Sequence, residues 1–217
     1  FSGGLKIKCS AQVVYALKHK KNTYRYGFAL HDIDTHNYSL LYDIYGSAID
    51  QYAHITKDVD MDALWQLFFD SGFIYPKKYS SLSEYKETFK QTFEKLYHQS
   101  RDIFVNLTYQ HNGKIYGHDS IIKSYERTWM SNHLCAIPMD KKRTGMYLLQ
   151  HMMNILDGLY RMPSIGLDFI TTWYRPENKF SHFFFGGYSL GLNNPKGSSI
   201  DCFAYVMHSP SVEKAGL

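Results

Sequence analysis

The feature that most restricts the fold is a long amphipathic segment, residues 145–160, between two strand-like segments. Its apolar residues recur at helical spacing, which predicts one long helix. They are Met146, Leu149, Met152, Met153, Leu156 and Tyr160. The strand before it, 132–137, ends at Pro138, because proline cannot continue a ladder inside a sheet. A polar, basic loop over 139–144 follows, and a second strand is predicted over 167–174. This order is typical of an α/β domain.

Other helices and strands are predicted on both sides of this unit. Asp58 or Asp60 can cap a helix that ends at Gly72, and Ser83 can open a second one. Strands over 102–110 and 114–124 flank Asn112-Gly113, a pair that suits a tight hairpin turn. After residue 174 we expect a short helix over 178–185, a break at Gly186-Gly187 and a final strand over 199–207.

The first part of the chain has a different pattern. Residues 7–15 alternate between apolar and polar, and 23–30 read as a second strand after a polar turn. The pair predicts an antiparallel hairpin, and a short helix over 34–45 is expected to end before Gly46. We therefore expect residues 1–46 to form a small unit of their own.

Composition excludes several classes of protein. The 217-residue chain has only short apolar runs, far below the roughly 20 residues that cross a bilayer. Its start, Phe1-Ser2-Gly3-Gly4, lacks the charged and apolar regions of a targeting peptide. Three widely spaced cysteines suggest neither a disulfide framework nor a metal site, so a cytoplasmic location is expected. Aromatic residues are spread along the chain rather than clustered beside basic ones, which argues against nucleic-acid binding.

The order of elements from about residue 47 to 217 resembles the GNAT-type N-acyltransferase superfamily. Two helices, three strands, a basic loop, a long helix, a strand, a short helix and a last strand follow one another as in that family. The resemblance implies a GNAT-like fold, an α/β domain with a mixed α+β sheet. It also implies transfer of an acyl group from acyl-CoA to a small-molecule or protein amine.

In this family the central strand runs into a loop of pattern Gln/Arg-x-x-Gly-x-Gly/Ala, which holds the acyl-CoA pyrophosphate at a helix start. Lys142 stands at the Gln/Arg position, Gly145 matches, and Tyr147 replaces the last small residue. The resemblance implies acyl-CoA contacts, from acetyl-CoA or a longer acyl chain, at Ile137, Lys142, Arg143, Thr144, Gly145 and Met146. Tyr147 either fills the phosphate space or packs into the core beside Leu149 and Phe169.

A second family motif, Asn-x-x-Ala followed by Tyr and Gly-Phe, matches loosely after the next strand. Asn178 is present and would contact the cofactor, but phenylalanines occupy the place of the expected tyrosine. Tyr188 or His182 would then have to act as the general acid. The candidate general bases on the central strands are His133 and Glu126, with His118 and Asp119 as further titratable groups. A structural role is the alternative for each of them.

The N-terminal hairpin resembles the closing third of a PilZ domain, a small β-barrel whose family role is binding cyclic di-GMP. The resemblance rests on a strand, a basic turn, a Tyr-Arg-Tyr-Gly-Phe-Ala-Leu strand, Asp-Ile-Asp and a short helix. The family's Arg-rich arm and Asp/Asn-x-Ser-x-x-Gly turn are absent from the sequence. Two functions follow as alternatives: an N-acyltransferase regulated by cyclic di-GMP, or a non-catalytic sensor or interaction module on a degenerate GNAT fold.

Overall fold

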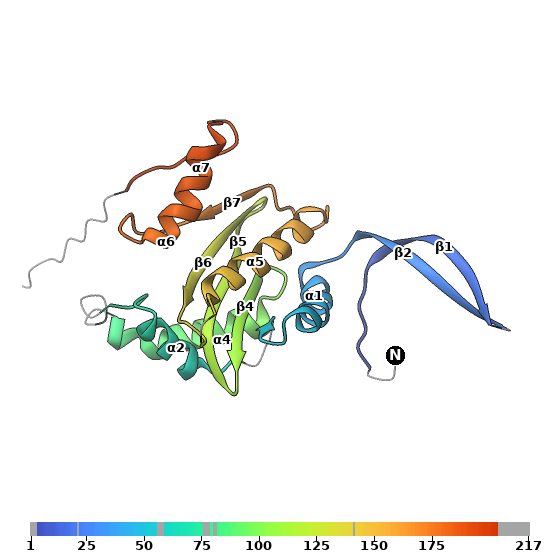
Figure 1. The fold of residues 1–217 in the computed structure, drawn as a ribbon, viewed down its shortest axis with the longest axis horizontal. Helices are drawn as coiled ribbons and strands as arrows, with labels where there is room; N and C mark the ends of the chain where they lie inside the picture. Colours follow the sequence, from blue (N-terminus) through green and yellow to red (C-terminus); the bar gives the residue numbers. More distant parts are fainter. Residues whose placement is uncertain are drawn as a thin grey trace, which may run out of the picture. The chain divides into compact units, whose positions relative to one another are not determined.

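The computed structural model describes residues 4–20, 22–55, 59–75, 79, 82–140 and 142–203, and centres on a five-stranded mixed sheet (Figure 1). The strands are β3 (Ala53–His54), β4 (Phe104–His111), β5 (Lys114–Tyr125), β6 (Thr128–Ala136) and β7 (Phe169–Thr172). Their order in the sheet follows the sequence; β3 to β6 pair antiparallel, and β6 and β7 pair parallel. The three central strands and the α/β class were predicted, and both predictions are confirmed.

The turn between β4 and β5 has the geometry that its sequence predicts. Asn112 and Gly113 have φ angles of 49° and 76°, in the left-handed region that glycine and asparagine tolerate best. The flanking residues His111 and Lys114 face each other in the ladder. The Asn-Gly pair therefore closes the predicted hairpin and fixes its register.

Each face of the sheet is covered by two helices. On one face lie α2 (Met61–Asp70) and α4 (Lys86–Gln99), the latter preceded by the 3₁₀ turn η1 (Ser83–Tyr85); on the other lie α1 (Thr35–Ile49) and α5 (Thr144–Tyr160). Side chains alternate across the strands. Phe104 packs with the α2 and α4 residues, whereas Val105 and Leu107 pack with those of α5. The two faces consequently have separate apolar clusters.

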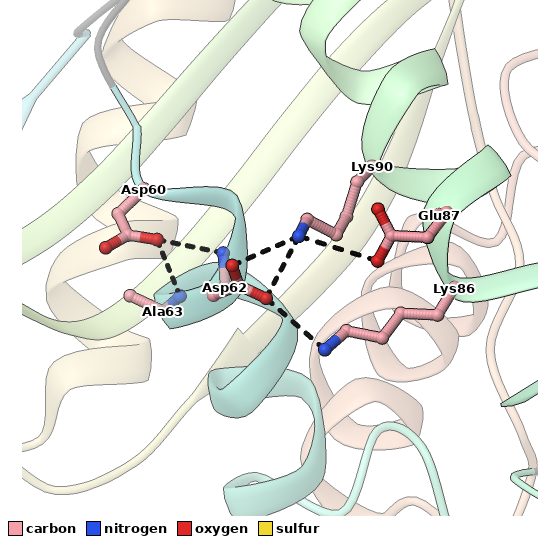
Figure 2. A network of polar contacts seen from close by, with 6 residues as sticks. All are labelled: Asp60, Asp62, Ala63, Lys86, Glu87 and Lys90. Atoms are coloured by element: carbon pink, nitrogen blue, oxygen red, sulfur yellow. Dashed lines mark hydrogen bonds and ion pairs between the residues drawn. The ribbon is translucent and has the colours of Figure 1, made fainter.

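A polar network fixes α2 against α4 at the rim of its face (Figure 2). Asp60 caps α2 by accepting hydrogen bonds from the backbone N–H groups of Asp62 and Ala63. The Asp62 carboxylate contacts the ammonium groups of Lys86 and Lys90 at 3.3 and 3.0 Å. The predicted cap of this helix is thus Asp60, the second of the two candidates.

The helix expected to end before Gly46 continues further. Asp34 caps α1, which runs through Gly46 to Ile49, and the Asp50 N–H donates to the Gly46 carbonyl oxygen. A Cβ on Gly46 would lie 3.1 Å from the Tyr42 ring, a tight contact that could be relieved only by a shift of that ring. Here glycine marks a close contact rather than a helix end.

The N-terminal strands form the predicted antiparallel hairpin. They are β1 (Ser10–Lys20) and β2 (Thr23–Asp32), and the ring of Tyr15 occupies the space beside Gly27. Their side chains are exposed or half-buried. Because two-stranded hairpins occur in many folds, the PilZ assignment and the domain boundary at residue 46 stay predictions.

The chain divides into two compact units, Phe1–Thr172 and Trp173–Leu217. In the second, α6 (Lys179–Ser181), the π-helical turn η2 (His182–Gly186) and α7 (Gly187–Leu192) follow one another directly. The break predicted at Gly186-Gly187 is therefore wrong: both have right-handed helical angles, and the helix ends at Asn193, with φ of 44°.

The final strand, predicted over 199–207, is not found in its described part. Residues 199–203 belong to no strand, and 204–207 lie outside the described residues. Among the described residues, no helix is both long enough and apolar enough to cross a membrane.

Candidate active site

The last part of β6 is where the sheet opens. The parallel pairing of β6 with β7 covers only Thr128–Ser131 and Phe169–Thr172. From Asn132 to Ala136, the pairings of the described residues join β6 to β5 alone. Half of β6 thus presents an edge of backbone N–H and C=O groups toward the side from which β7 has separated.

A β-bulge bends this part of β6. His118 pairs with Cys135 and Ser120 with Asn132, so Asp119 faces two residues instead of one. His133, one of the two, has a φ of 58°, which is unusual for a residue with a side chain. Bulges of this kind redirect side chains and are frequent beside functional sites.

The segment that joins β6 to α5 is held by a buried threonine. The Thr144 side chain accepts a hydrogen bond from the Met139 N–H at 3.2 Å, and Met139 forms a bridge with Lys142. Thr144 and Met139 are both almost fully buried, at 2% and 3% exposure. The loop is therefore anchored to the first residue of the helix. Thr144 thus has a structural role, and a cofactor contact at Thr144 stays a prediction.

The start of α5 is an uncompensated helix N-terminus. Its N-cap residue, Arg143, makes no side-chain capping hydrogen bond, and the first turn contains no acidic residue. The first N–H groups of a helix have no partner within the helix and carry partial positive charge. Gly145 is half-buried and Arg143 exposed, so the arrangement suits an anion approaching the backbone.

The other predicted cofactor contacts differ in placement. Ile137 packs against the α2–α4 cluster, and its N–H donates to the Tyr116 carbonyl oxygen. Met146 is 39% exposed on the first turn of α5. Lys142 places its ammonium group 4.0 Å from the centre of the Tyr52 ring, on the α1 side of the loop. The structure thus groups Arg143, Gly145 and Met146 at the helix start.

Tyr147 lies in neither of the two expected places. Its ring stacks on Tyr109 of β4, with a centroid distance of 6.2 Å and an angle of 16° between the planes. It is 41% exposed, so it does not pack in the core beside Leu149 and Phe169. The ring is directed to the β4 side of α5, away from the edge where β7 has separated from β6.

Of the two candidate bases, His133 lies in β6 and Glu126 precedes it. His133 is half-buried among the rings of Phe68, Phe73, Phe89 and Phe93, at centroid distances of 5.2–6.0 Å. Glu126 is exposed in the turn before β6, at the opposite end of the strand from the loop. The structure therefore brings His133, but not Glu126, to the part of β6 that β7 leaves open.

Two further candidates belong to the second unit. Asn178 caps α6: its side-chain oxygen accepts a hydrogen bond from the Ser181 N–H at 3.2 Å. Tyr188 is 68% exposed on α7. The Asn178 cap explains locally why a helix starts there, and a cofactor contact at Asn178 stays a prediction.

The neighbouring β5 residues His118 and Asp119 are fully buried on opposite faces of the sheet. Burial lowers the pKa of His118 to about 3, assisted by the nearby His133. Burial raises the pKa of Asp119 to about 8, against hydrogen bonds from the Ser120 N–H and the Ser131 hydroxyl. Both groups are therefore uncharged near pH 7.

A cavity of about 590 Å³ lies between α1 and α5 and contains a polar network that the sequence analysis did not find. The Tyr109 hydroxyl donates to the Asp50 carboxylate at 3.0 Å, and the Nε2 atom of His151 lies 3.7 Å from the same carboxylate. The Tyr42 hydroxyl lies 3.1 Å from Nδ1 of His151. These residues come from α1, the α1–β3 turn, β4 and α5, so only the folded chain brings them together.

No protein-family model matches the sequence, and no curated protein does either. Solved structures give partial similarities. The PaiA N-acetyltransferase of Thermoplasma acidophilum, in complex with coenzyme A, has a TM-score of 0.46 and 16% identity over 63% of this chain and 88% of its own. An acetyltransferase of Streptococcus agalactiae has a TM-score of 0.41 and 16% identity, covering 64% and 82%.

The diaminobutyrate acetyltransferase of Paenibacillus lautus, in complex with its substrate and coenzyme A, is a third example. It has a TM-score of 0.41 and 20% identity, covering 62% of this chain and 71% of its own. All three are acetyltransferases, and two were solved with coenzyme A. The similarity of this chain to all three is low in both sequence and structure.

Proposed function

We propose that the chain is an N-acyltransferase that moves an acyl group from acyl-CoA to an amine. The observation that carries the proposal is the uncapped start of α5 directly after a strand whose edge is open. The first N–H groups of α5 and the Arg143 guanidinium would bind the pyrophosphate. The backbone groups at the open edge of β6, from Asn132 to Ala136, would form hydrogen bonds with the pantetheine amides, as they would with a neighbouring strand.

The chemistry requires one bond to form and one to break. The amine nitrogen attacks the thioester carbonyl carbon, the C–N bond forms, the C–S bond breaks, and the thiolate leaves. The attacking amine must lose a proton and the thiolate must gain one. His133 is the candidate base, acting through water, since it lies at the bulge in the open part of β6. Tyr188 is the candidate acid.

Calorimetric titration with acetyl-CoA and longer acyl-CoAs tests the proposal, with substitutions at the start of α5. Gly145→Asp places a carboxylate in the first helical turn, where it stabilises the helix but repels phosphate. We expect an unchanged or higher melting temperature and much weaker binding. Gly145→Ala is the matched uncharged control.

A second pair of variants tests how much the positive charge of Arg143 contributes to acyl-CoA binding. Arg143→Ala should weaken acyl-CoA binding in a salt-dependent way, because a charge-assisted contact is lost. Arg161→Ala, at the other end of α5, should leave binding unchanged, since Arg161 pairs with Asp157. Absence of heat and of any thermal shift with every acyl-CoA would contradict the acyltransferase proposal and favour a non-catalytic module.

The regulatory part of the hypothesis is separate. If β1 and β2 belong to a PilZ-like unit preceding a domain over 47–217, a protein that contains the whole unit should bind cyclic di-GMP. Fluorescence titration measures this directly. A complete gene product that does not bind the nucleotide would remove the regulatory proposal and leave acyl transfer untouched.

A further inference from the structure

The cavity between α1 and α5 has an aromatic wall. Tyr52, Tyr109 and Tyr147 follow one another along it, with ring centroids 5.7 Å and then 6.2 Å apart. Faces of aromatic rings carry partial negative charge and attract cations. The wall comes from three elements, β4, α5 and the α1–β3 turn, so its form depends on the fold and not on a single segment.

A cation of the protein already lies on this wall. The Lys142 ammonium group is 4.0 Å from the Tyr52 ring centre, within the range of a cation–π contact. Among the described residues, the ion pairs do not include Lys142. The aromatic ring is therefore the contact that holds the ammonium group. The Lys142 side chain thus takes the place on the Tyr52 ring where another cation could bind.

The Asp50 carboxylate supplies the negative charge of the cavity. Its two oxygens accept hydrogen bonds from the Tyr52 N–H and the Tyr109 hydroxyl, both at 3.0 Å, which fix its orientation. The facing titratable groups are His151, 3.7 Å away, and the Tyr109 phenol, whose pKa burial raises further above its ordinary value. Apart from its contact with His151, this carboxylate has no cationic partner among the ion pairs of the described residues.

We propose that this cavity binds a ligand with a compact organic ammonium group, placed on the tyrosine rings and facing Asp50. The amide side chains of Gln51 and Gln150 line the same cavity and can accept hydrogen bonds from such a group. An anion would instead meet the Asp50 carboxylate and the negative ring faces. The bound cation displaces the Lys142 ammonium group from Tyr52. This inference does not rest on acyl transfer.

Calorimetric titration at constant ionic strength tests the proposal, with choline and 1,4-diaminobutane as cations and 3,3-dimethyl-1-butanol as the uncharged analogue of choline. Lys142→Met removes the internal competitor and should tighten cation binding several-fold. An anion site would give the opposite result, because the variant removes the Lys142 ammonium group, an attractive charge for an anion. Lys114→Met is the matched control, since Lys114 lies 5.1 Å from the Tyr116 ring, outside the cavity.

Substitution of the cavity wall completes the test. Asp50→Asn and Tyr52→Leu should each weaken binding by roughly tenfold, in the range expected for a partly desolvated cation. Circular dichroism checks folding; if Asp50→Asn does not fold, Tyr52→Leu and Lys142→Met still decide. Unchanged or weaker cation binding in Lys142→Met, or equal binding of the uncharged analogue, would overturn the proposal. Acyl-CoA titration of the same proteins reports separately on the acyltransferase.

Discussion

The two faces of the five-stranded sheet have opposite characters. On the α2–α4 face, Phe68 is fully buried and contacts five other aromatic or histidine rings, among them Phe89 and His118. On the α1–α5 face, Tyr109, Asp50 and His151 surround a cavity that solvent can enter. The first face is closed by aromatic rings, whereas the second combines a buried apolar cluster with a cavity lined by polar groups. Substitutions of similar size should therefore have unequal effects on the two faces.

Truncation of an aromatic ring should give the largest difference. Phe68→Ala removes a side chain with 0% exposure and leaves a cavity in the closed face, at a cost of about 3–5 kcal/mol. Tyr147→Ala removes a ring that is 41% exposed beside an existing cavity, and should cost about 1 kcal/mol or less. Urea unfolding of both variants measures this. Equal losses would mean that the two faces are packed equally tightly.

Dependence of stability on pH should show the next largest effect, because the faces contain buried groups with opposite pKa shifts. The pKa of His118 is lowered to about 3. The stability that the folded chain gains from this shift is therefore complete above about pH 6.5 and is lost as pH falls. The pKa of Asp119 is raised to about 8, so its contribution is complete below about pH 4 and is lost as pH rises to 8. Each changes stability by about 1.4 kcal/mol per pH unit in its window.

These opposed slopes should cancel between about pH 4 and 6.5 and leave a plateau. Of these two groups, only Asp119 titrates differently in the folded and unfolded chain from about pH 6.5 to 8, so stability should fall by about 2 kcal/mol. Asp119→Asn should abolish this fall and, because no opposite slope then cancels that of His118, extend the acid limb up to about pH 6.5. Urea unfolding at half-unit pH steps provides the measurement. A fall that persists in Asp119→Asn would assign it to another group.

Local patterns predicted most of the fold. The helix at 145–160, the strand ending before Pro138 and the Asn112-Gly113 turn each depend on residues close in sequence, and all three are found. Two errors came from glycines, and a third is the strand expected over 199–207, whose described residues form no strand. Gly46 and Gly186 were interpreted as helix ends, but both lie inside helical segments, where Tyr42 and Tyr174 occupy the space beside them.

The candidate site was only partly predictable. The basic loop at a helix start is visible in the sequence, whereas the bulge at His133 has no residue signature, because only a few per cent of residues other than glycine adopt positive φ and a histidine alone does not mark one. The Asp50–His151 pair joins residues that are about a hundred positions apart, and no spacing rule connects them. The orientation of the Lys142 side chain likewise depends on its contact with Tyr52, a ring from another element.

The smallest effect should come from removing one hydroxyl on each face. On the closed face, Nδ1 of His118 lies 3.2 Å from the His133 carbonyl oxygen, which can only accept, so Nδ1 carries the proton and Nε2 accepts from the Tyr97 hydroxyl at 2.8 Å. Tyr97→Phe leaves that buried nitrogen without its donor and should cost about 1–3 kcal/mol. Tyr42→Phe removes the hydroxyl beside His151, but water in the cavity can take its place, so a loss of at most about 1 kcal/mol is expected. Thermal and urea unfolding of the two variants, compared at pH 7, measure the difference. A larger loss in Tyr42→Phe would show that the α1–α5 cavity excludes water and that the contrast between the two faces is wrong.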